Sequence, residues 1–231
     1  MTLTKATVAG LVKIEEQPTQ NHYHEGRAYH SVKVSSQRNA DASKVDYLRL
    51  YFSYDSNQDF KNVFKPGNYI RFSGSVVKSK ITESLSDIAV SLDSATLVPK
   101  EELDKMIEVH SYVKSGSVIN MTGEIIKVGK EIISNNIKSV SILVMEEDEN
   151  GYKVIVKFTG VGDAAEKISK MSKGDLVKIL AKVYSYKIKN RIDLDNYYLH
   201  DSRISSITKI VDKSGSDGPK SELDEKGEVN E

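Results

Sequence analysis

The segment Asp46–Tyr54 carries the residues of this chain best suited to binding chemistry. Its apolar residues alternate with polar ones, which is the period of a half-buried strand. The positions expected to face a core are Leu48, Leu50 and Phe52, and those left outside are Tyr47, Arg49 and Tyr51. Cations bind phosphates and flat rings stack on unpaired bases, so the outward triplet indicates binding of single-stranded nucleic acid. The alternative is that tyrosine is simply favoured on exposed strands.

Neighbouring segments extend this set of candidate binding residues. By the same alternation, Tyr29 and Lys33 point outward from Ala28–Ser36, and Tyr69 and Arg71 from the strand after Gly67. We expect these four residues to share one face with the triplet. Further candidates lie in two hairpins, Lys78 and Lys80 in the first and Tyr184, Tyr186, Lys187, Lys189 and Arg191 in the second. A solvated hairpin whose charges only aid solubility is the alternative for these.

A histidine-rich loop, Gln17–Arg27, is the one place where metal binding comes into question. His22, His24 and Glu25, with His30 following, have ligand chemistry suited to zinc, but the chain contains no cysteine and its other histidines, His110 and His200, lie far off in the sequence. We therefore expect no metal and no cofactor, and interpret Tyr23, His24 and Arg27 as further contacts to a bound strand. No phosphate-binding loop, nucleophile elbow or zinc-protease motif occurs, so the sequence predicts a binding protein and not an enzyme.

The chain repeats itself. Lys65–Lys80 (KPGNYIRFSGSVVKSK) is answered by Ser172–Lys187 (SKGDLVKILAKVYSYK), with Gly67 and Gly174 separated by 107 positions. The flanks match as well, with Phe52 answered by Phe158, and Leu11–Ile14 by Ile125–Val128. Each copy reads strand, strand, strand, short helix, strand, strand. Such a period indicates tandem duplication of a domain of about 100 residues.

Five short strands with a small helix between the third and fourth are typical of the OB-fold barrel. We therefore predict an all-β protein of two tandem five-stranded barrels. The expected boundaries are residues 1–99 for the first barrel, 100–114 for a linker, 115–211 for the second barrel and 212–231 for a disordered acidic tail. Pro99, immediately before the linker, should open a helix that ends near Val109.

The turn and strand of each repeat resemble a known family. Lys-Pro-Gly-Asn-Tyr-Ile-Arg-Phe-Ser-Gly-Ser-Val, and more literally Ser172-Lys-Gly-Asp-Leu-Val177, are similar to the start of the fourth strand in single-stranded DNA-binding proteins. The resemblance implies a protein that coats single-stranded DNA in replication, recombination or repair. Two barrels in one chain look more like a phage or divergent replication protein than the one-barrel bacterial form. The chain also ends in Glu228-Val229-Asn230-Glu231, without the phenylalanine tip of the bacterial tail, so recruitment of partner enzymes through such a tip is not implied.

The formal net charge of zero conceals a division between body and tail. Residues 212–231 hold seven acids and three lysines, which leaves 30 bases and 26 acids in the rest. A mildly basic body with an acidic tail fits a polyanion binder whose tail competes with DNA or recruits replication or recombination proteins. Neither a membrane-length apolar run nor a signal-peptide pattern occurs, so we expect a cytoplasmic protein with no membrane partner.

The second repeat offers a different outward face. Leu143 and Ile155 point outward beside Lys153 and Lys157. An apolar outward face predicts contact with the first domain or with a second subunit, as in a homodimer. The alternative functions left open by the sequence are therefore an OB-fold assembly module and a binder of RNA or oligosaccharide.

Overall fold

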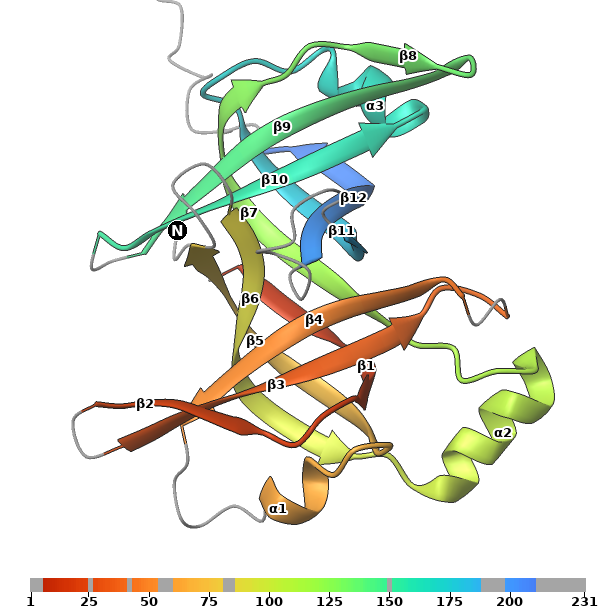
Figure 1. Cartoon of the computed structure of the whole chain (residues 1–231). Helices are drawn as coiled ribbons and strands as arrows, with labels where there is room; N and C mark the ends of the chain where they lie inside the picture. The colour runs from red at the N-terminus through yellow and green to blue at the C-terminus, as the bar shows by residue number, and fades with distance from the viewer. Residues whose placement is uncertain are drawn as a thin grey trace, which may run out of the picture.

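The first half of the chain folds into a closed barrel. The computed structural model describes residues 6–24, 27–40, 43–53, 60–80, 86–148, 151–187 and 198–210. The elements of the first barrel are β1 (Thr7–Ile14), β2 (Thr19–His24), β3 (Arg27–Gln37), β4 (Val45–Ser53), α1 (Phe60–Val63), β5 (Tyr69–Lys80) and β6 (Ser86–Leu97). They form the lower half of Figure 1. Five strands close in the order β1-β3-β4-β6-β5-β1, with β4 and β6 parallel and the other pairs antiparallel.

Alternation of side chains produces this barrel in the way that the sequence predicts. Leu48, Leu50 and Phe52 are buried inside, and the ring of Phe52 stacks on that of Phe64, the residue after α1, with centroids 4.7 Å apart. One prediction was wrong, because β2 occupies part of the segment expected to be a loop. Its polar residues pair with β3 from Thr19 opposite Ser31 onward, so backbone hydrogen bonds and not apolar side chains hold this strand.

The second half repeats the architecture. Its elements are β7 (Gly116–Val128), β8 (Ile132–Ser134), β9 (Ile137–Glu147), β10 (Lys153–Val161), α3 (Asp163–Ile168), β11 (Leu176–Lys187) and β12 (Tyr198–Lys209). The order β7-β9-β10-β12-β11-β7 closes this barrel, again with one parallel pair, β10 and β12. The two barrels are joined by α2 (Lys100–His110), the connector expected after Pro99, which contains no buried residue. No helix in the described part of the chain is both long enough and apolar enough to span a bilayer.

Hydrogen bonds establish which residues of the two barrels are equivalent. Gly67 and Gly174 have φ of 91° and 94°, and their N–H groups donate to the carbonyls of Ile14 and Ile125. The match of the two glycines is therefore confirmed, and both turns need the left-handed backbone that glycine adopts readily. Elsewhere the expected matches shift. Ile14 is equivalent to Ile125 instead of Val128, and Phe158 corresponds to Leu50 instead of Phe52, because short apolar strands resemble one another at several registers.

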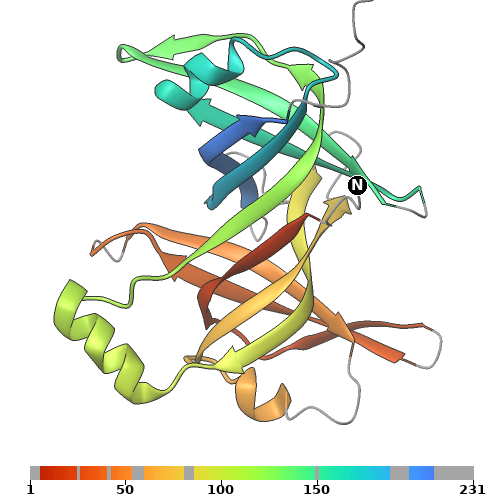
Figure 2. The same cartoon turned by 180° about the vertical axis from the view of Figure 1, so that it is seen from behind.

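Pairing of β1 with β7 joins the two barrels into one twelve-stranded sheet. Thr7 lies opposite Asn120 and Gly10 opposite Ser117, and Figure 2 shows β7 running from the α2 connector along the first barrel into the second. At Gly10 an added Cβ would lie 2.3 Å from the carbonyl oxygen of Gly116. This close approach of the two barrels accounts for the glycine in the interior of β1.

Candidate nucleic-acid interface

The pairing of β3 with β4 gathers rings and cations on the outside of the first barrel. Lys33 pairs with Arg49, Ser31 with Tyr51, and Ser35 with Tyr47, while the alternate residues fill the core. Tyr29 continues the same row on β3. We call these five residues the β3–β4 face: Tyr29, Lys33, Tyr47, Arg49 and Tyr51. All five are half-buried, so the part of each side chain next to the backbone is held by its neighbours while its end stays accessible to solvent.

Local contacts hold the two cations of the β3–β4 face in position. Lys33 Nζ lies 4.5 Å from the centroid of the Tyr47 ring. An Arg49 N–H donates to Ser31 Oγ at 3.2 Å, and the same guanidinium lies 3.5 Å from a carboxylate oxygen of Glu16. The side chains of Arg49 and Glu16 are each 40% exposed, and a pair of this kind contributes little stability. A phosphate can therefore replace the carboxylate at small cost.

Tyr69 and Arg71 do not share this face, which corrects the expectation. They lie on β5, which is separated from β4 by β6 and from β3 by β1. Arg71 forms a two-pronged ion pair with Glu102 of α2, with one nitrogen–oxygen distance of 2.9 Å. The hydrogen bond to Glu102 raises the pKa of Arg71 and lowers that of the carboxyl. Alternation predicted that both residues face outward, but it carries no information on which side of a closed barrel they face.

The β11–β12 region of the second barrel places Tyr184 among cations. Its ring lies 5.1 Å from Cζ of Arg38 and 4.9 Å from Cζ of Arg203. Tyr186, two residues on, is 51% exposed, and burial of its hydroxyl, followed by the charge of Asp201, raises its pKa. Tyr184 thus binds guanidinium groups in this structure, whereas Tyr186 presents a ring to solvent.

The remaining candidate binding residues have side chains outside the part of the chain that the structure describes. Lys78 and Lys80 lie in β5, Lys187 ends β11, Tyr23 and His24 belong to β2 and Arg27 begins β3, but their side chains lie outside the described part. Lys189 and Arg191, like the acidic tail 212–231, lie outside the described residues altogether. Within the described residues, no group of three or more His, Cys, Asp or Glu side chains is placed to hold a metal ion.

A partly buried network that sequence reasoning missed ties the β3–β4 face to the second barrel. Arg38 Nε donates to Asp46 Oδ2 at 2.8 Å, and its terminal nitrogen donates to the Ser185 carbonyl at 2.8 Å. The Ser185 N–H donates to Asp46 Oδ1 at 2.6 Å, while Ser185 Oγ accepts from the Tyr47 N–H at 2.8 Å. The hydrogen bond to Asp46 raises the pKa of Arg38. The start of β4 is thus fixed by residues about 140 positions away, for which no local signal exists.

His200 supports the same strand from β12. Its Nε2 lies 2.7 Å from the Tyr47 carbonyl oxygen. A carbonyl only accepts, so Nε2 carries the proton and donates it. Burial of the imidazole lowers the pKa of His200, although its backbone hydrogen bond opposes that shift. At neutral pH the uncharged imidazole therefore positions Tyr47.

The corresponding face of the second barrel carries exposed apolar residues beside Lys153 and Lys157. Ile155 on β10 is 39% exposed, and the β8–β9 hairpin exposes Ile132, Ile133 and Ile137. Ile155 is exposed in the described part of the chain, although β10 itself contacts β5 of the first barrel. Contact of this face with the other domain or with a second subunit stays a prediction.

Similar solved structures identify the fold. No protein-family model matches the sequence, and no curated protein matches it significantly. The structure is similar to the wild-type single-stranded DNA binding protein from Thermus aquaticus, with a TM-score of 0.71 and 11% identity over 94% of this chain and 98% of that one. A deletion variant of the same Thermus protein matches with a TM-score of 0.70 and 12% identity, over 96% of this chain and all of that one. At this identity the likeness shows the fold, which is two tandem OB-fold barrels.

Proposed function

We propose that this chain is a non-enzymatic protein that binds and coats single-stranded DNA with little sequence preference. The observation that carries the proposal is the β3–β4 face, where three tyrosines alternate with Lys33 and Arg49 on the outside of an OB-fold barrel. Strands two and three of this fold, here β3 and β4, provide its usual ligand face. Both Thermus aquaticus structures, which are similar over nearly the whole chain, are described as single-stranded DNA binding proteins, and this supports the same function.

The energetics of this face suit sequence-independent binding. Each base stacked on a tyrosine contributes about 1–3 kcal/mol, and every base has a flat face to offer. Arg49 and Lys33 add phosphate contacts, each of which releases counterions and makes affinity fall with salt. We place the activity in replication, recombination or repair, where single strands are exposed, and in the cytoplasm. In the same proposal, the acidic residues 212–231 compete with DNA for the basic surface or recruit replication or recombination proteins.

A titration of a fluorescent oligo-dT of about 35 nucleotides tests the proposal, with anisotropy read at 50 and 200 mM salt. The test variant is Arg49→Ala/Tyr51→Ala. The matched control, Tyr69→Ala/Arg71→Ala, removes the same residue types from β5. We expect the β3–β4 variant to weaken binding by at least about tenfold and the control to bind within about twofold of wild type. Absence of binding by the wild-type chain at 50 mM salt would refute the function.

The apolar face of the second barrel favours a second candidate, an assembly module. Exposed Ile132, Ile133 and Ile137 form an apolar hairpin tip of the kind that binds protein partners. This candidate would be supported if the chain binds neither oligo-dT nor oligo-rU but self-associates in sedimentation experiments. Preference for oligo-rU over oligo-dT would instead identify an RNA-binding protein.

A further inference from the structure

Two clefts lie between the barrels, and they are equivalent to each other. The N–H of Arg38 donates to the Lys44 carbonyl at 2.9 Å, and the N–H of Asp148 donates to the Tyr152 carbonyl at 3.0 Å. Arg38 follows Val34 by four residues, as Asp148 follows Val144, and both valines pair with the first strand of their barrel. Arg38 and Asp148 therefore occupy the same position in the two barrels. Counting from the matched glycine turns, Lys182 likewise corresponds to Ser75, and Tyr184 to Val77.

The first cleft is basic. It has a volume of about 350 Å³, and Arg38, Lys114 and Lys182 contribute three cations to its walls. Its one carboxylate, Asp46, is bound by Arg38. Lys114 and Lys182 are exposed, so their ammonium groups can reach a ligand in the cleft. The cleft therefore has a net positive charge.

Arginine and aromatic groups extend this basic surface. Lys182 pairs across the β11–β12 ladder with Arg203, whose guanidinium lies over the Tyr184 ring. Arg203 also contacts Asp201 at 3.0 Å, through an exposed pair that a phosphate can displace. From Arg38, on the β3–β4 side, to Arg203 on β12, the cations thus form one track across the junction of the barrels.

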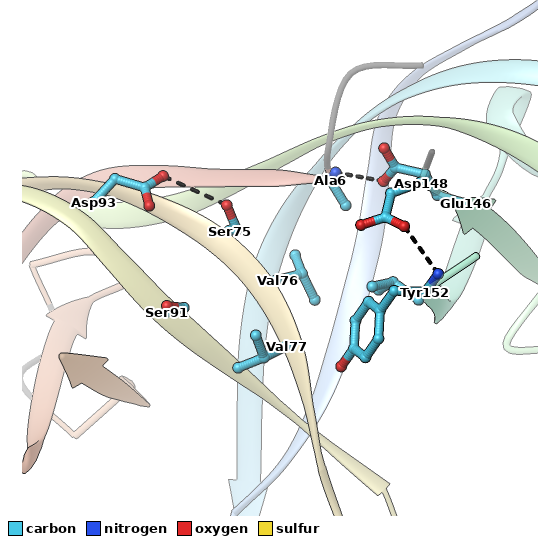
Figure 3. Close-up of a pocket in the computed structure, with 10 residues that line it drawn as sticks. Ala6, Ser75, Val76, Val77, Ser91, Asp93, Glu146, Asp148 and Tyr152 are labelled. Atoms are coloured by element: carbon cyan, nitrogen blue, oxygen red, sulfur yellow. Dashed lines mark hydrogen bonds between the residues drawn. The ribbon is translucent and has the colours of Figure 1, made fainter. Parts of the chain in front are cut away.

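The second cleft has the opposite character (Figure 3). It has a volume of about 220 Å³ and is lined by Asp93, Glu146 and Asp148, and none of its lining residues in the described part of the chain is cationic. Glu146 accepts a hydrogen bond from the Ala6 N–H, and Asp148 accepts one from the Tyr152 N–H at 2.9 Å. These carboxylates are held in place by the backbone and would repel phosphates at short range.

We propose that a bound single strand crosses from the first barrel to the second through the basic cleft and is excluded from the acidic one. This inference rests on the proposed function and adds the path that the strand takes. The two-fold relation of the barrels offers two equivalent crossings, but the residues at equivalent positions differ in charge. Arg38 stands where the other cleft has Asp148, and Lys182 stands where it has Ser75. The cations of the basic cleft therefore attract the phosphates of a strand, whereas the acidic cleft offers them no such stabilisation.

The salt dependence of oligo-dT binding tests the path. Each lost phosphate contact lowers the slope of log affinity against log salt by about 0.7 for a single strand, so Lys114→Gln/Lys182→Gln should lower it by about 1.4. Lys167→Gln/Lys170→Gln, at the exposed end of α3, is the control with the same change of net charge. The third variant, Asp93→Asn/Asp148→Asn, removes charge from the acidic cleft. An oligo-dT of about 35 nucleotides is the probe, and far-ultraviolet circular dichroism confirms folding.

The expected result is a reduced slope for Lys114→Gln/Lys182→Gln alone, with the other two variants close to wild type. An unchanged slope for this variant, alongside wild-type binding that depends on the β3–β4 face, overturns the path and leaves the proposed function standing. An equal reduction in the α3 control also overturns it, since net charge would then be the cause. Failure of the wild-type chain to bind at all refutes the proposed function itself, and the path with it.

Discussion

Replacing Gly10 by alanine should destabilise the contact between the barrels. The added Cβ would lie 2.3 Å from the Gly116 carbonyl oxygen and 3.0 Å from Ser117 Cα. Ordinary contacts of a Cβ are 3.4 Å or longer. The neighbouring atoms are backbone, which cannot rotate aside, so β7 must move by about 1 Å along a ladder of five residue pairs.

The size of the effect follows from two opposing contributions. Overpacking of this kind costs about 1–3 kcal/mol. Replacing glycine by alanine lowers the conformational entropy of the unfolded chain, which stabilises the folded state by about 0.4–1 kcal/mol at a position that tolerates a side chain. We therefore expect Gly10→Ala to lower the free energy of unfolding by about 1–2 kcal/mol. The same substitution at Gly116, on the facing strand, meets no atom within 4 Å and is not in the left-handed region, so it should be neutral or slightly stabilising.

Urea denaturation followed by circular dichroism and tyrosine fluorescence measures both variants. With a denaturant slope of about 2 kcal/mol per molar, Gly10→Ala should lower the unfolding midpoint by roughly 0.5–1 M relative to wild type, and Gly116→Ala should not. Equal midpoints for the two alanine variants would contradict the reasoning, because an added Cβ collides with the facing strand at Gly10 and meets no atom within 4 Å at Gly116.

Two further predictions concern pH and the tail. Burial holds the pKa of His200 below its unfolded value near 6.5, so the unfolded chain binds the proton more readily. The contribution of neutral His200 to the free energy of unfolding is therefore fully present above about pH 6.5 and declines as the pH falls toward the pKa of the folded state. His200→Gln, whose amide can still donate to the Tyr47 carbonyl, should flatten this decline in thermal melts between pH 7 and 5, and an unaltered profile would assign the decline to other groups. Removing residues 212–231 should tighten oligo-dT binding at 50 mM salt and have a smaller effect at 200 mM. If the truncated and full-length chains bind with equal affinity at both salt concentrations, the tail does not compete with DNA.

Local sequence patterns predicted much of the fold. Such patterns, together with the repeat, located ten of the strands in the described chain, and alternation identified inward residues such as Leu48 and Leu50. The glycine turns at Gly67 and Gly174 revealed the repeat, because both need positive φ. The β2 strand was missed because its polar residues carry no alternation, and its stability depends on pairing with β3.

The sequence by itself determined that rings and cations alternate on the outside of strands, since the period of a strand is a local property. Only the tertiary structure decided which of them lie together. It grouped Tyr47 and Arg49 with Lys33, and it placed Arg71 against Glu102 on another side of the barrel. The physical reason is closure, because an outward side chain of a barrel can face any direction around its axis. Similarly, the opposed charges of the two clefts arise where segments far apart in the chain meet, and contacts of that range leave no local pattern to read.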